Sequence, residues 1–143
     1  MKRITTFAAA ALLSLSLSAA PAFAQRAGNS VSVQQYGGYN GAGVAQAGRA
    51  NRARLVQEGN ANTGAIQQNG NRNDAALRQF GSGHNGAISQ TNNGNTGCML
   101  QWGANTTGYI EQNGGEATAV VVMNGRTYRV SGAEAARYCA RMR

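Results

Sequence analysis

Residues 51–62 read Asn-Arg-Ala-Arg-Leu-Val-Gln-Glu-Gly-Asn-Ala-Asn, and the same pattern returns along the chain every 11 residues. The repeated unit is Asn-x-small-x-aliphatic-x-Gln-x-Gly-x-x. Its glutamines form a grid that runs through Gln35, Gln46, Gln57, Gln68, Gln79, Gln90, Gln101 and Gln112. A fixed period of this kind indicates a repeat architecture.

The other positions of the unit follow the same grid. The residue two after the asparagine is small or valine, and the residue four after it is always apolar. Continuing the grid into a ninth unit places Ala119 and Val121 at these two positions, with Met123 in place of the glutamine. An asparagine stands six residues before the glutamine in six units, and His84 and Thr106 replace it in two others; the six are Asn29, Asn40, Asn51, Asn62, Asn73 and Asn95.

The spacing within the unit favours a strand over a helix. An 11-residue repeat can build a helical supercoil, but the glycine and the usual asparagine of each unit disfavour a helix. Asparagine, small residue, aliphatic residue and glutamine occupy alternate positions, which places all four on one face of a strand. We therefore predict an all-β fold: a flattened β-solenoid of 11-residue strand-turn units, 22 residues per coil, with a short C-terminal hairpin and helix tail.

This geometry predicts ladders of buried amide side chains along the solenoid axis. Successive coils stack about 4.8 Å apart, so that residues 22 apart lie above one another and identical amides can pair donor with acceptor. An unpaired buried amide costs about 1–3 kcal/mol, which is a physical reason for the strict grid. The eight glutamines and six asparagines above are the predicted ladder and polymerisation residues. Outward rows are expected to form a mostly polar, solvated face, with Arg52 beside Asp74, and Ala76 beside Cys98.

Residues 1–24 have the pattern of a secretory signal peptide. Lys2 and Arg3 make a positive start, an apolar run follows, and Ala22-Phe23-Ala24 is a small-x-small cleavage site. We expect cleavage after Ala24 and export of the mature chain. The predicted organisation is then a short leader at 25–28, a repeat domain of nine units at 29–125, and a basic tail at 126–143.

The tail departs from the repeat in structure and charge. The sequence predicts a strand at 120–123, a hairpin turn at Asn124-Gly125, a returning strand at 126–130 and a helix from residue 133. The chain has a formal net charge of +8, and a basic end can hold an anionic surface or nucleic acid or act as a solubilising cap. The candidate anchor residues are Arg126, Arg129, Arg137, Arg141 and Arg143.

Two features bear on chemistry. A disulfide between Cys98 and Cys139 would fold the tail back along the outer face, and free or intermolecular thiols are the alternative. The chain has no phosphate loop, zinc spacing or nucleophile motif, and His84 in an asparagine position is interpreted as a tolerated substitution. We expect no cofactor and no enzymatic activity.

The unit of residues 51–62 resembles the curlin repeat of bacterial curli fibre subunits, and phased copies cover nearly all of the chain after residue 28. The resemblance implies secretion across the outer membrane by dedicated machinery, and assembly with other curlin subunits into functional amyloid that serves adhesion and biofilm matrix. The basic, divergent C-terminal end is similar to the nucleator subunit of that system.

The hypothesis from sequence is a secreted, fibre-forming subunit that polymerises through its ladders and aliphatic rows. A surface nucleator anchored by its basic end and a non-polymerising secreted β-solenoid that binds a ligand remain as alternatives. Unpaired edge strands at the coil ends are expected to recruit further chains. If the two ends are alike, subunits add head to tail.

Overall fold

The computed structural model describes residues 28–142. The predicted signal peptide, most of the predicted leader and Arg143 lie outside these described residues. Within them the elements are β1 (Ser30–Tyr36), β2 (Gly41–Ala47), β3 (Arg52–Asn60), β4 (Thr63–Asn69), β5 (Asp74–Ser82), β6 (Asn85–Thr91), β7 (Thr96–Ala104), β8 (Thr107–Asn113), β9 (Ala117–Met123), β10 (Arg126–Ser131) and α1 (Gly132–Ala140).

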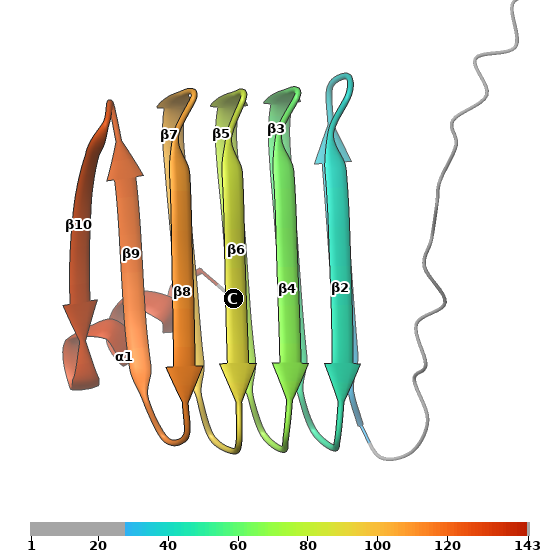
Figure 1. Ribbon diagram of the computed structural model, residues 1–143, viewed down its shortest axis with the longest axis vertical. Coiled ribbons are helices and arrows are strands. Elements are labelled where there is room, and N and C mark those ends of the chain that lie inside the picture. The colour runs from blue at the N-terminus through green and yellow to red at the C-terminus, as the bar shows by residue number, and fades with distance from the viewer. Residues whose placement is uncertain (1–27, 143) are drawn as a thin grey trace, which may run out of the picture.

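Successive strands alternate between two sheets. The larger sheet has the order β1-β3-β5-β7-β9-β10, and the smaller sheet has the order β2-β4-β6-β8. All neighbours are parallel except β10, which runs antiparallel to β9. In Figure 1 the smaller sheet, β2, β4, β6 and β8, lies in front of β3, β5 and β7 of the larger sheet. Gln57 lies opposite Gln79, and Gln68 opposite Gln90, so the predicted β-solenoid with 22-residue coils is confirmed.

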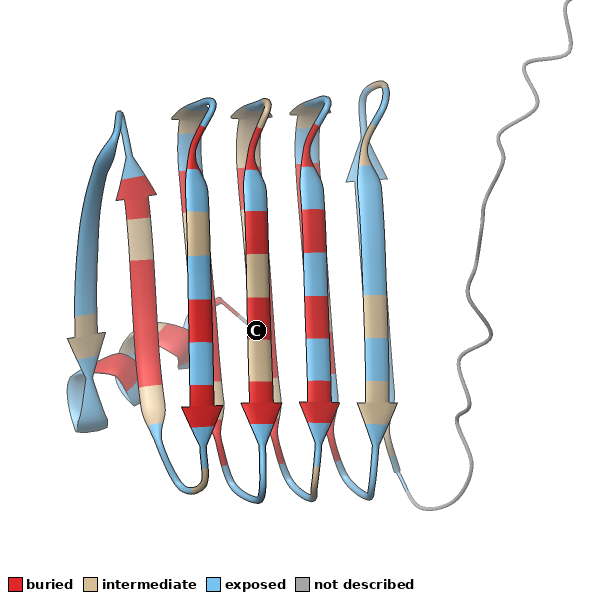
Figure 2. Ribbon diagram, in the orientation of Figure 1, coloured by how far each residue is buried: buried red, intermediate tan, exposed pale blue. Residues whose placement is uncertain are grey.

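The aliphatic positions form the core between the two sheets. Leu55 and Leu77 of the larger sheet pack in one cluster with Ile66 and Ile88 of the smaller sheet, and none is more than 2% exposed. Buried and exposed residues alternate along β4, as Figure 2 shows. The small position lets the sheets approach, because a Cβ at Gly64 would lie 2.9 Å from Leu55 Cδ1.

Each turn contains two positions with positive φ. The first is the glycine two after the glutamine, for example Gly59 at +120°. The second position directly precedes the asparagine, and the repeat pattern alone does not reveal it. Glycine or asparagine, which tolerate the left-handed region, fill this position in other turns. Four successive turns instead place other residues there, at φ between 54° and 58°: Tyr39, Ala50, Ala61 and Arg72. Such a conformation costs about 1–2 kcal/mol for an ordinary L-residue.

Replacing Ala61 by glycine is therefore expected to stabilise the fold by about 0.5–1 kcal/mol, because relief of the left-handed strain exceeds the entropy that glycine loses on folding. The same replacement at Ala65, an exposed residue within β4, relieves no strain and should destabilise by about 0.5–1 kcal/mol. Urea unfolding of the two variants measures both effects. A destabilised Ala61→Gly variant would contradict this account of the turn.

The ninth strand is offset by one residue from the predicted grid. β9 pairs with β7 at a spacing of 21 residues, which places Val122 opposite Gln101. The prediction that Val121 and Met123 occupy the inward positions is wrong, because Val120 and Val122 are the buried residues and Met123 is 41% exposed. The glutamine column of the larger sheet therefore ends at β7 with an apolar residue above it.

The C-terminal tail folds back over the outer face of the larger sheet. β9 and β10 form the predicted hairpin, with Asn124 and Gly125 at positive φ in its turn. Helix α1 lies behind the strands in Figure 1 and packs on outward side chains of β5, β7 and β9. The prediction that Ala76 and Cys98 lie on a solvated face is therefore wrong, since this helix buries both. Ala119, predicted to point into the core, is buried under the helix instead.

Two contacts hold the tail in this position. A disulfide joins Cys98 on β7 to Cys139 on α1, with Cα atoms 5.4 Å apart. The Nη2 group of Arg78 donates a hydrogen bond of 2.8 Å to the carbonyl oxygen of Met142. Within residues 28–142, no helix has the length and apolar character needed to cross a membrane.

Candidate functional site

Two columns of glutamine side chains run through the interior. In each column, Nε2 of one glutamine donates to Oε1 of the glutamine 22 residues further on, at 2.6–2.8 Å. All these bonds point the same way, toward the C-terminal end of the solenoid. The column of the larger sheet contains Gln35, Gln57, Gln79 and Gln101, and that of the smaller sheet contains Gln46, Gln68, Gln90 and Gln112.

From Gln46 onward, each ladder glutamine also donates to a backbone carbonyl of the opposite sheet. The second Nε2 hydrogen of Gln57 bonds the carbonyl oxygen of Gly41 at 2.9 Å, and that of Gln68 bonds the carbonyl oxygen of Arg52 at 2.9 Å. Both N–H groups of an interior glutamine thus have partners, and its Oε1 atom accepts from Nε2 of the glutamine 22 residues earlier. A buried amide that meets its hydrogen-bonding needs in this way avoids the cost of desolvation.

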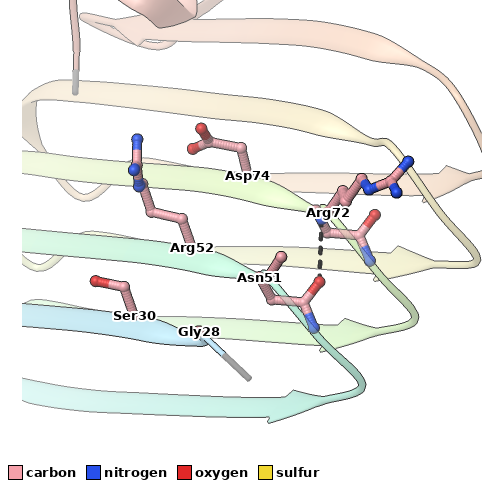
Figure 3. Close-up of a pocket in the computed structure, with 8 residues that line it drawn as sticks. Gly28, Ser30, Asn51, Arg52, Arg72 and Asp74 are labelled. Carbon is pink, nitrogen blue, oxygen red and sulfur yellow. Dashed lines mark hydrogen bonds between the residues drawn. The ribbon is translucent and has the colours of Figure 1, made fainter. Parts of the chain in front are cut away.

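The asparagine row works differently from the predicted amide ladder. The Oδ1 atom of Asn51 accepts the backbone N–H of Asn73 at 3.0 Å, which is the dashed line in Figure 3. Its Nδ2 atom donates to the carbonyl oxygen of Gly70 in the turn, at 2.8 Å. Among the six asparagines of the repeat, all of them within the described residues, only Asn95 donates to the side chain of another, Oδ1 of Asn73, at 3.1 Å. The asparagines therefore clamp turns to strands and the glutamines alone form continuous ladders.

His84 replaces an asparagine without interrupting the row. Its backbone N–H donates to Asn62 Oδ1 at 3.0 Å, as an asparagine at this position would. Its Nδ1 atom accepts the backbone N–H of Thr106, and Nε2 lies 3.0 Å from the carbonyl oxygen of Phe80. The proton therefore belongs on Nε2. The imidazole is 1% exposed and its two nitrogens serve the fold.

The N-terminal end of the solenoid is open. Among the strands of residues 28–142, β1 pairs only with β3 and β2 only with β4. The Oε1 atoms of Gln35 and Gln46 accept no hydrogen bond from the described residues, although both Nε2 atoms donate to the next rung. The inward-facing side chains of Val31 and Val33 are 46% and 43% exposed because no coil of the described chain covers them. This end presents apolar surface, amide acceptors and unpaired strand edges together.

The C-terminal end is closed in its glutamine columns. The Nε2 atom of Gln101 turns to the carbonyl oxygen of Thr106, and that of Gln112 to the carbonyl oxygen of Glu116, each at 3.0 Å. These carbonyl oxygens take the place of the glutamine Oε1 atoms that a further coil would supply. The sequence offered one signal for this ending, the replacement of glutamine by apolar residues after Gln112.

The other predicted residues lie outside the ladders. Arg52 and Asp74 are neighbours in register, as predicted, and line a hollow of about 320 Å³ with Ser30 and Asn51 (Figure 3). Residues 28–142 contain no group of three or more metal-binding side chains. The tail arginines of the described chain are all exposed: Arg126 and Arg129 lie on β10, Arg137 lies on α1, and Arg141 directly follows α1.

Comparison with protein families covers the first part of the chain that carries these columns, up to residue 91. Residues 27–59 and 59–91 match the family model of the curlin associated repeat. Comparisons with curated proteins and with solved structures found no match. The curlin family consists of structural subunits rather than enzymes. The tandem repeats and the stacked glutamines make this chain a member of the curlin family.

Proposed function

We propose that this protein is a structural subunit of an extracellular curli-like fibre, which it joins by stacking its first coil on a coil of another subunit. The observation that carries the proposal is the open N-terminal end, where two glutamine columns stop beside two edge strands, at Oε1 acceptors that have no donor among residues 28–142. Edge strands with such ladders are templates for further strands. Membership of a family that self-associates into fibres supports the same function.

The energetic basis of this association is continuation of the solenoid. A coil placed on β1 and β2 would cover the half-exposed side chains of Val31 and Val33, and burial of apolar area contributes about 25 cal/mol per Å². The same coil would supply Nε2 donors to Gln35 and Gln46. Both interactions repeat those already made between β3 and β5, so that docking requires no new geometry.

Export and surface function complete the proposal. Cleavage of the predicted signal peptide after Ala24, passage through an outer-membrane secretion machinery and incorporation into a fibre would place the chain in the extracellular matrix, where it would contribute to adhesion and biofilm. The Cys98–Cys139 disulfide supports an oxidising compartment, because disulfides are rare in reducing cytosol.

Two adjacent glutamines of β1 provide a matched test of docking. Gln35 faces inward in the open column and Gln34 faces outward. Fluorescent mature chain (25–143) is added to preformed curli fibres, and its binding to fibre ends is counted. Gln35→Met removes the acceptor and should reduce end binding at least tenfold, whereas Gln34→Met should leave it within about twofold of wild type, as expected for a surface substitution.

The negative results of this experiment are informative. Absence of wild-type binding at fibre ends would reject the fibre-subunit function and favour a non-polymerising secreted solenoid. Equal binding by the Gln35→Met and Gln34→Met variants would reject the ladder as the basis of docking. Circular dichroism of both variants controls for folding.

The exposed basic tail favours a second candidate function, that of a surface nucleator. The arginines on β10 and α1 could hold the chain to an anionic surface or nucleic acid, leaving the open end free to start a fibre. In a second assay, without preformed fibres, a nucleator would shorten the lag phase of curli subunits, whereas a simple fibre subunit would only add to existing ends.

A further inference from the structure

The two ends of this solenoid are not equivalent, contrary to the condition for head-to-tail addition. At the N-terminal end of the described chain, both sheets finish in parallel edge strands, β1 and β2, and no described residue covers the core there. At the C-terminal end, the larger sheet continues into the antiparallel strand β10, which pairs with β9 along its whole length. Figure 1 shows β10 as the last strand at this end. A parallel coil arriving there would meet a strand of the wrong direction.

The side chains at the C-terminal end also break the repeat. Val122 occupies the glutamine position of β9, so the column of the larger sheet has no rung to offer. Glu116 occupies the asparagine position, and its carbonyl oxygen accepts the last amide hydrogen of the smaller sheet's column from Gln112. β8 keeps a free edge in the smaller sheet, but a coil brings one strand to each sheet, and β10 obstructs the other half.

The disulfide holds this closure in place. Helix α1 follows β10 directly, and its Ala135 and Cys139 are at most 1% exposed against the outer face of the larger sheet. Because Cys139 is bonded to Cys98 on β7, the helix cannot leave the sheet without reduction. β10 is thus tethered at both ends, by the hairpin turn to β9 and by the helix to β7.

The direction of the ladders defines the partner that fits the open end. Every Nε2–Oε1 bond runs from a lower to a higher residue number, so Gln35 and Gln46 need donors from a preceding coil. A donor row of this kind exists at the C-terminal end of a curlin-repeat chain whose columns are not closed. A second copy of this protein cannot supply it, because its own donors are satisfied by Thr106 and Glu116. Two N-terminal ends facing each other would oppose acceptors to acceptors.

We propose that this protein binds a single partner, the uncapped C-terminal coil of another curlin-repeat chain, on the surface formed by β1 and β2, and that its own C-terminal end stops further growth. This inference rests on the proposed fibre function and adds a position to it: the chain is a terminal subunit. The β10–α1 segment, locked by the Cys98–Cys139 disulfide, is the stop.

The test follows growth at both ends of individual preformed curli fibres in a solution of curli subunit monomers. Labelled, oxidised mature chain is added at a concentration far below that of the monomers. One of the two ends of each fibre should cease to grow once it binds the labelled chain, while the other end continues, and the protein alone should sediment as a monomer. Growth that passes beyond bound chains, or fibres formed by the oxidised protein alone, would overturn the inference. Failure to bind any end would instead reject the fibre function itself.

A variant pair separates the cap from general effects of substitution. Cys98→Ser with Cys139→Ser, combined with Val122→Gln, releases the tail and restores a rung. Resumption of growth at stopped ends should then become at least ten times more frequent. Ala104→Ser with Ala133→Ser changes two exposed positions, keeps the disulfide and should stop growth as wild type does. If the first variant still bound fibre ends and stopped their growth as completely as wild type does, the tail would not be the stop.

Discussion

Replacing Gly59 by alanine is expected to lower the free energy of unfolding by more than about 4 kcal/mol, or to prevent folding. Single substitutions cause losses of this size through only a few mechanisms, strain at a special backbone conformation among them. Gly59 has a φ of +120°, where side chains are strained. A Cβ there would also collide with the carbonyl oxygen of Gly81, one coil further along. The obstacle is backbone, fixed by the pairing of β3 with β5, and cannot move aside as a flexible side chain could.

The matched control is Gly43, which lies exposed in β2 and has no atom within 4 Å of an added Cβ. Gly43→Ala should be neutral or stabilise by up to about 1 kcal/mol, because alanine loses less backbone entropy on folding. Urea titrations of both variants, followed by far-ultraviolet circular dichroism, measure the difference. If Gly59→Ala unfolded at the wild-type urea concentration, the glycine column would not be a steric requirement of the turn.

The solenoid could be predicted because two independent periods agree. Alternation within the unit places Leu55 and Gln57 on the same face of a strand, and the 11-residue repeat aligns identical residues in successive coils. Both conditions hold from Asn29 to Gln112, and the structure places these residues as predicted. The strand-turn fold can be predicted because the pattern within each unit and the repeat between units agree.

In the ninth strand the two periods no longer agree. Residues 120–122 are three valines in succession, so the alternation that reveals which face is buried is missing. A one-residue shift exchanges the two faces of a strand. Shortening the turn before β9 by one residue makes this shift, and nothing in the run of valines opposes it. The grid alone therefore assigned Val121, rather than Val120, to the core.

The repeat pattern also does not predict that asparagine and glutamine side chains have different hydrogen-bond partners. The asparagine side chain is one methylene shorter, so its amide stays close to the backbone, where Asn51 reaches Gly70 of the neighbouring turn. Side chains of this length commonly bond to nearby backbone groups. The longer glutamine reaches both the next rung and the opposite sheet. The repeat pattern predicts the same ladder for both amides, because both recur with the same period.

Replacing the buried Gln68 by methionine is expected to lower the free energy of unfolding by about 3 kcal/mol, although the two side chains are similar in length. The substitution leaves Oε1 of Gln90 without its donor, Nε2 of Gln46 without its acceptor, and the carbonyl oxygen of Arg52 with one bond fewer. Each buried polar group that loses its partner costs about 1–3 kcal/mol. The added apolar burial of methionine offsets part of this sum.

Gln67, the preceding residue of β4, points outward and is exposed, so Gln67→Met should change the free energy of unfolding by less than about 0.5 kcal/mol. Both variants carry the same substitution in the same strand, and the difference between their urea midpoints isolates the ladder from strand propensity. Equal midpoints would mean that a buried rung contributes no more than a surface amide. In that case the strict glutamine grid would have to serve assembly between chains rather than stability within one, because only a contact formed after folding could then require it.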